Sequence, residues 1–84
     1  MRLVNIRYAT KLWIPGYSTT HKDYVDTLVF TVKNGKGFAR AFIFEFEGGW
    51  LLWINSERGR GALEYNKDLM RIERVLIRWL EDPF

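Results

Sequence analysis

The sequence predicts an α+β fold: a four-stranded antiparallel sheet, made of an N-terminal strand and a three-strand meander, followed by one C-terminal helix. Apolar residues alternate with other residues along residues 2–13 and 26–55, which is the two-residue period of strands. Asn-Gly and Gly-Gly dipeptides interrupt the second stretch, and both are typical of two-residue hairpin turns. Over residues 63–81 the apolar positions change to helical spacing. Strands followed by a helix indicate a layered α+β domain.

The length of 84 residues indicates one small domain, spanning residues 1–84, with a thin hydrophobic core. A second subunit would add buried area to such a core, so we expect a homodimer or a subunit of a hetero-complex. The many charged residues, the short loops and the absence of glutamine favour a thermophilic source.

The elements follow one another along the chain. Val4, Ile6 and Tyr8 share one parity within residues 2–13, which predicts the first strand. Residues 14–21 contain Pro-Gly, which predicts an irregular loop between this strand and the meander. Residues 56–61 form a second loop before the helix, and Pro83 ends the helix because proline cannot continue its hydrogen bonds.

The two turns fix the predicted register of the meander. They place Lys33 opposite Lys36 in the first hairpin and Phe44 opposite Trp53 in the second. Because side chains alternate across a sheet, the meander then has two apolar faces. The first carries Leu28, Phe30, Val32, Ala39, Ala41, Ile43, Leu52 and Ile54. The second carries Thr27, Val29, Thr31, Lys33, Lys36, Phe38, Arg40, Phe42, Phe44, Phe46, Leu51 and Trp53.

One helix cannot cover both faces. A helix of about 17 residues is roughly 26 Å long and 10 Å wide, whereas four strands span roughly 19 Å. We expect the helix to lie on the first face, where alanines allow close approach. The second face then requires a second copy, a partner protein, the loop at 14–21 or stacked bases to cover it, unless the sheet curls into a small barrel.

The second face is the best candidate binding surface, because single-stranded nucleic acids bind to grooves that combine cations with aromatic platforms. The residues expected to contact nucleic acid there are Lys33, Lys36, Phe38, Arg40 and Phe42. The alternative is that its aromatic residues form a protein interface or a core, with Phe44, Phe46, Leu51 and Trp53 as the contact residues.

Two further basic groups extend this hypothesis. Lys67, Arg71, Arg74 and Arg78 recur at helical spacing on one side of the predicted helix, where they would contact phosphates or remain solvated. Arg58 and Arg60 alternate with glycines just before the helix, where backbone N–H groups and arginines suit an anion, although a simple connecting turn explains the glycines equally well.

Nothing in the sequence indicates catalysis, a metal site or a cofactor. The chain has no cysteine, and its single histidine, His21, stands in a loop. Glu45 and Glu47 share a parity at the end of a strand and could pair as carboxylates, but solvated charges at the helix edge are the favoured interpretation. No apolar run approaches the roughly 20 residues that span a bilayer, and the N-terminus lacks a signal-peptide core, so we expect a cytoplasmic protein.

The order of elements, a meander of strands before one C-terminal helix, resembles that of PUR-repeat and Whirly-type single-strand-binding domains. This resemblance implies a non-enzymatic nucleic-acid-binding protein that works as a dimer or paired repeat. The net charge of +3 permits DNA or RNA as the partner but is modest for a protein dedicated to phosphates. The alternative function is therefore a protein–protein interaction module, acting as an accessory subunit or small inhibitor of a larger complex.

Overall fold

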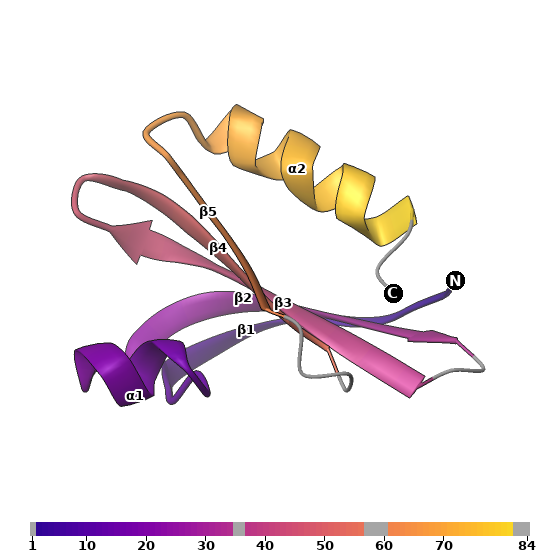
Figure 1. The fold of residues 1–84 in the computed structure, drawn as a ribbon, viewed down its shortest axis with the longest axis horizontal. Coiled ribbons are helices and arrows are strands. Elements are labelled where there is room, and N and C mark those ends of the chain that lie inside the picture. Colours follow the sequence, from indigo (N-terminus) through magenta and orange to yellow (C-terminus); the bar gives the residue numbers. More distant parts are fainter. Residues whose placement is uncertain (1, 35–36, 57–60, 82–84) are drawn as a thin grey trace.

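The computed structural model describes residues 2–34, 37–56 and 61–81, and it confirms the α+β fold. The described strands form one antiparallel meander in the order β1-β2-β3-β4-β5, and the C-terminal helix α2 packs on β4 and β5. Figure 1 shows α2 on one side of the twisted sheet and the short helix α1 on the other. The elements are β1 (Arg2–Leu12), α1 (Tyr17–His21), β2 (Val25–Asn34), β3 (Gly37–Phe46), β4 (Gly49–Ser56), β5 (Gly61–Asn66) and α2 (Leu69–Glu81).

The predicted count of four strands is wrong, because Gly61–Asn66, which spans the end of the predicted loop and the start of the predicted helix, forms a fifth strand, β5. Helix α2 begins only at Leu69, where polar side chains satisfy its first backbone groups. The Oδ1 atom of Asn66 accepts a hydrogen bond from the backbone N–H of Asp68 at 2.8 Å. The Oδ1 atom of Asp68 in turn accepts one from the N–H of Met70 at 3.0 Å. Asp68 therefore acts as the N-cap of the helix.

Both hairpins are shifted by two residues from the predicted register. Lys33 pairs with Phe38 rather than Lys36, and Phe44 pairs with Leu51 rather than Trp53. A shift of one residue exchanges the two faces of a strand, whereas a shift of two residues preserves them. The predicted membership of the two faces is therefore retained although the predicted partners are wrong.

The second hairpin shows why its turn does not lie at the predicted Gly48-Gly49 dipeptide. Its two central residues are Glu47 and Gly48, with φ angles of 47° and 76°, and positive φ at both positions is the mark of a type I′ turn. Gly49 is already paired, with Phe46. A Cβ at Gly49 would lie 2.7 Å from the hydroxyl of Tyr65, which donates a hydrogen bond to the carbonyl of Glu47 at 3.0 Å. Gly48 therefore supplies the positive φ that the turn requires, and Gly49 leaves room for the side chain of Tyr65.

Two hydrophobic clusters lie on opposite faces of the sheet. Beneath α2, on what we call the helix-side face, Ile72 and Leu76 pack against strand residues. The strand residues buried in this cluster are Ala41, Ile43, Leu52 and Ile54. On the opposite, loop-side face, Ile14 and Tyr17 from the segment between β1 and β2 pack over a second cluster. Its other buried members are Ala9, Val29, Phe42, Phe44 and Leu51.

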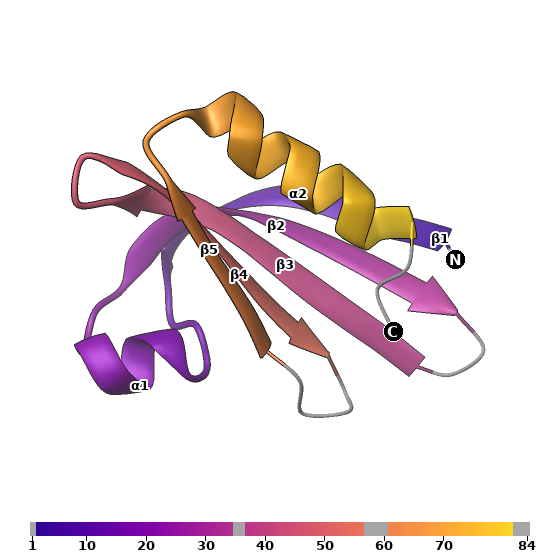
Figure 2. The same ribbon diagram turned by 45° about the horizontal axis from the view of Figure 1, so that its top comes forward.

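The segment between β1 and β2, predicted as an irregular loop, contains helix α1 and covers part of the loop-side face (Figure 2). The backbone N–H of Ile14 donates to the hydroxyl of Ser18 at 2.8 Å, and both residues are fully buried. Gly16 has a φ of 87°, and a Cβ there would lie 2.7 Å from the ring of Trp53. Of the possible covers considered for the second face, the segment 14–21 of the chain itself covers part of it.

Candidate nucleic-acid interface

Helix α1 covers only one end of the loop-side face. Lys33 and Arg40 are exposed cations toward the other end, on β2 and β3, and Arg7 is an exposed cation in the middle of β1. Phe38 pairs with Lys33 and has 40% of its surface exposed, whereas Arg7 lies further away, in the row of Val29 and Phe42. We call this surface the basic patch; it consists of Arg7, Lys33, Phe38 and Arg40 with the polar residues Asn5, Thr31 and Asn55.

The pairing of the strands brings these residues together from four parts of the sequence. Asn5, Thr31, Arg40 and Asn55 are cross-strand partners in one row, and the pair Lys33–Phe38 lies two residues further along. From the usual strand spacing and rise, the backbone positions of Lys33 and Arg40 are roughly 8 Å apart, and those of Arg7 and Arg40 roughly 12 Å. Side chains as long as arginine and lysine reach a common ligand across such distances.

Phe38 and Arg40 interact directly. The guanidinium carbon of Arg40 lies 5.3 Å from the centroid of the Phe38 ring, within the range of a cation–π interaction. Arg40 thereby contacts one face of an exposed aromatic ring. The arrangement suits an unpaired base stacked on Phe38 beside a phosphate bound by the guanidinium.

The charges of the two faces differ in sign. Among the described strand residues that form the basic patch and its neighbours in the same rows, none is an Asp or a Glu. Strand residues Asp26, Glu45 and Glu64 belong instead to the helix-side alternation. The modest net charge therefore conceals a separation of charge between faces, which brings the basic patch closer to what an anionic polymer requires.

The other aromatic residues predicted for the second face are not available as stacking platforms in this structure. Phe42 is 5% exposed and belongs to the loop-side cluster. The predicted interface residues also lie in this cluster: Phe44 and Leu51 are buried, and Phe46 and Trp53 are partly buried against it. The ring of Tyr17 in α1 lies 4.6 Å from that of Phe44 and 5.9 Å from that of Trp53.

The remaining predicted contacts separate into two groups. Arg71, Arg74 and Arg78 are exposed on α2, which lies across the sheet from the basic patch, so the two sets of cations do not form one surface. Lys67 is exposed but precedes α2 and is not part of the helix. Lys36, Arg58 and Arg60 lie outside the residues that the structure describes.

Arg7 is a member of the patch that sequence analysis missed. It lies on β1, opposite Val29 of the loop-side cluster. The signal was present in the alternation of β1, because Asn5, Arg7 and Ala9 share the parity opposite to Ile6. What the alternation could not show was which of the two β1 faces continues the aromatic face of the meander.

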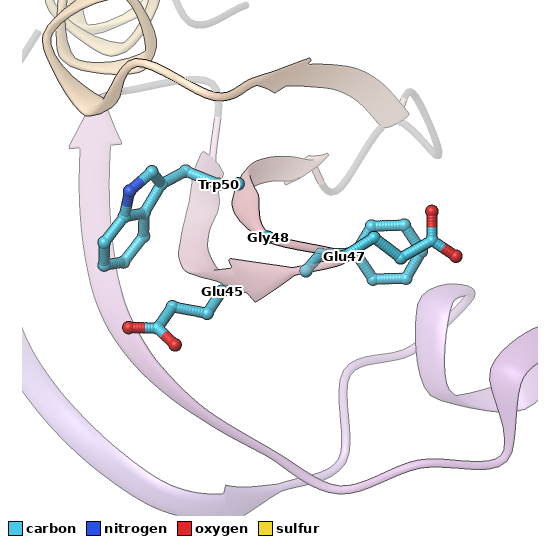
Figure 3. A pocket seen from close by; sticks show the side chains of 6 residues that line it. Glu45, Glu47, Gly48 and Trp50 are labelled. Carbon is cyan, nitrogen blue, oxygen red and sulfur yellow. The ribbon is translucent and has the colours of Figure 1, made fainter.

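The structure shows what surrounds His21, Glu45 and Glu47, the residues considered for catalysis. His21 stacks on Tyr17, with ring centroids 4.3 Å apart, and its Nδ1 atom lies 3.0 Å from the carbonyl oxygen of Tyr17. Glu45 and Glu47 do not form a carboxylate pair, since their side chains point away from each other across the β3–β4 hairpin (Figure 3). Within the described residues, no group of three or more His, Cys, Asp or Glu is arranged to hold a metal ion.

No helix in the described parts of the chain combines the length and apolar character needed to cross a bilayer. Comparison of the chain with protein-family models, with curated proteins and with solved structures gave no match. The assignment of a function therefore depends on the surfaces described above.

Proposed function

We propose that the protein is a non-enzymatic single-stranded nucleic-acid-binding protein that uses the basic patch. The observation that carries this proposal is the exposed ring of Phe38, which Arg40 contacts and Lys33 pairs with, on a face that also carries Arg7 and has no acidic residue among the described strand residues in those rows. Single strands are bound by such combinations of cations and aromatic platforms, largely without sequence readout.

In this proposal, Arg7, Lys33 and Arg40 bind consecutive phosphates, and a base stacks on the free side of the Phe38 ring. Asn5, Thr31 and Asn55 offer hydrogen bonds to sugars or base edges. Binding of a single strand by three cations releases counterions, so the slope of log K against log salt is expected to be about −2. The stacked base contributes roughly 1–3 kcal/mol.

The test is fluorescence anisotropy of a labelled oligothymidylate, titrated with protein at several salt concentrations. Arg7→Ala combined with Arg40→Ala should weaken binding by roughly tenfold or more and reduce the salt slope by about 1.4, because two phosphate contacts are lost. The matched control is Arg71→Ala combined with Arg74→Ala, which removes the same charge from the opposite side of the sheet.

Equal losses of affinity in the two double variants would show that the oligonucleotide does not use the basic patch. Absence of binding at low salt would remove the proposed function altogether. Phe38→Ala separates stacking from charge: it should weaken binding roughly fivefold or more without changing the salt slope, since no cation is lost.

A second candidate function, protein binding, is favoured by a different surface. Helix α2 packs mainly on β4 and β5, and on the β1–β2 side of the helix-side face four large apolar side chains are between 41% and 62% exposed: Leu3, Ile6, Tyr8 and Leu28. We call these four residues the apolar patch. A contiguous exposed apolar patch beside a long edge strand is typical of surfaces that bind another polypeptide.

A further inference from the structure

The sheet forks at the end where α1 lies. The β2–β3 ladder ends at the pair Leu28–Ile43, although β2 begins three residues earlier and β3 continues to Phe46. Beyond that pair, β2 follows β1 and β3 follows β4, so the described segments 25–27 and 44–46 pair only with their outer neighbours. Figure 1 shows the two pairs of strands diverging at this end.

Thr27 closes the fork at its base. Its side chain is 1% exposed, and its hydroxyl donates a hydrogen bond to the carbonyl of Ile43 at 2.9 Å, where the next rung of the ladder would begin. The inner edges of β2 and β3 thus face each other across a groove rather than hydrogen-bonding directly. Facing strand edges are what an extended peptide backbone binds in β-strand addition.

The groove between these edges has a volume of about 670 Å³. This lies within the range of about 300–1,000 Å³ that is usual for ligand sites. Its walls carry the aromatic residues Tyr8, Tyr24 and Trp50 and the carboxylates Asp26 and Glu45. Figure 3 shows Glu45 and Trp50 projecting from the β3–β4 hairpin toward the same side.

The charge of the groove favours a cationic occupant, since Lys11 is the only cation among its lining residues. The carboxylates Asp26 and Glu45 lie on opposite walls of the groove, and the charges of both affect the hydroxyl of Tyr8. The pKa of the Tyr8 hydroxyl lies above its ordinary value of 10.0 because of desolvation, the charge of Asp26, a hydrogen bond with Asp26, and the charge of Glu45. Exposed aromatic faces beside carboxylates bind the side chains of Arg and Lys by combined cation–π and ionic attraction.

We infer that this groove binds an extended segment of a partner protein that carries Arg or Lys between apolar residues. The segment adds its backbone to the open strand edges and places a cation between Trp50, Tyr8 and the two carboxylates. This inference rests on the second candidate function, protein binding, and names its site and its class of partner. It is independent of oligonucleotide binding because the basic patch lies on the other face.

The test uses two blocked pentapeptides, acetyl-Val-Arg-Val-Arg-Val-amide and its counterpart with Glu in place of Arg, titrated into ¹⁵N-labelled protein. The basic peptide should bind at least about tenfold more tightly, because the acidic peptide meets like charges. Its shift changes should centre on the amides of residues 25–27 and 44–46. Acetyl-arginine amide alone should bind more weakly, since it lacks the extended backbone.

Glu45→Gln should weaken binding of the basic peptide by about threefold, the size expected of a partly exposed ion pair. Glu64→Gln, at another exposed acid of the helix-side alternation, is the matched control and should leave binding unchanged. Equal affinity for the two peptides, or equal effects of the two glutamine variants, would overturn the groove assignment. So would the absence of binding at millimolar peptide.

One further variant distinguishes failure of the groove from failure of protein binding in general. If Ile6→Ser abolishes binding of the basic peptide while Glu45→Gln leaves it unchanged, the peptide lies on the part of the apolar patch formed by Leu3 and Ile6, outside the groove that Tyr8 and Leu28 line. Protein binding would then stand as a function, and the groove would not be its site.

Discussion

The two faces of the sheet are each half covered, but they leave opposite kinds of surface exposed. On the helix-side face, α2 packs over β4 and β5 and leaves the apolar patch exposed. On the loop-side face, α1 packs over one end and leaves the basic patch exposed. Solvent satisfies the cations of the basic patch, whereas it opposes exposure of the apolar patch. If a polypeptide covers either face, we therefore expect it on the helix-side face rather than on the basic patch.

The largest effect that tests this comparison should come from two phenylalanines on the same face of β3. Phe44 is 1% exposed under α1, whereas Phe38 is 40% exposed in the basic patch. Phe44→Ala should lower the free energy of unfolding by about 3–5 kcal/mol, because it creates a cavity in a packed cluster. Phe38→Ala should lower it by about 1 kcal/mol or less. Urea denaturation measures both, and similar losses would mean that α1 does not cover its end of the face.

A smaller effect should separate two isoleucines of α2. Ile72 is 1% exposed and belongs to the helix-side cluster, whereas Ile77 is 57% exposed on the same helix. Ile72→Ala should lower the free energy of unfolding by about 2–4 kcal/mol. Ile77→Ala should change it by less than about 0.5 kcal/mol, since it removes little packing and favours the helix slightly. If both variants were neutral by thermal denaturation, α2 would not be packed on the sheet.

The smallest effect should appear at high pH. Burial, followed by the charges of Asp23 and Glu47, raises the pKa of Tyr17 above the ordinary value of 10.0. The folded protein therefore holds this proton more tightly than the unfolded chain. The resulting stability is fully present below about pH 10 and is lost as the pH rises through the folded-state pKa.

Tyr17→Phe should consequently lose less stability than the wild type between about pH 9.5 and 11, because it lacks the titrating hydroxyl. The measurement is the urea midpoint across this range. Tyr24→Phe, at a position that is 61% exposed, is the matched control and should follow the wild type. An unchanged pH dependence in Tyr17→Phe would contradict the burial of this side chain under native conditions.

Much of the sheet could be predicted from local patterns. The alternation in β2, β3 and β4 identified both faces, and it did so although the predicted register of both hairpins was wrong by two residues. Strand β5 was missed because a short segment with apolar residues next to a helix fits either periodicity. The capping pattern at Asn66 and Asp68 was the available signal for the boundary.

The candidate site was predictable only in part, for a related reason. Alternation placed Lys33, Phe38 and Arg40 on one face with Phe42, but it did not show that α1 buries Phe42 and leaves Phe38 exposed. Periodicity also placed arginines on α2 without showing that α2 lies across the sheet from the basic patch. Whether a face is covered depends on contacts between segments distant in sequence. The local spacing of apolar residues does not reveal such contacts.

By itself, the sequence determined the α+β class, the order of an N-terminal strand, a three-strand meander and a C-terminal helix, and the division of the meander into two faces. These follow from backbone geometry, which repeats every two residues in a strand and every 3.6 in a helix. Only the tertiary structure decided which half of each face is covered, where the sheet forks, and that Arg7 joins Lys33 and Arg40. These depend on how segments far apart in the chain pack together, and packing is a property of the whole molecule rather than of any one pattern.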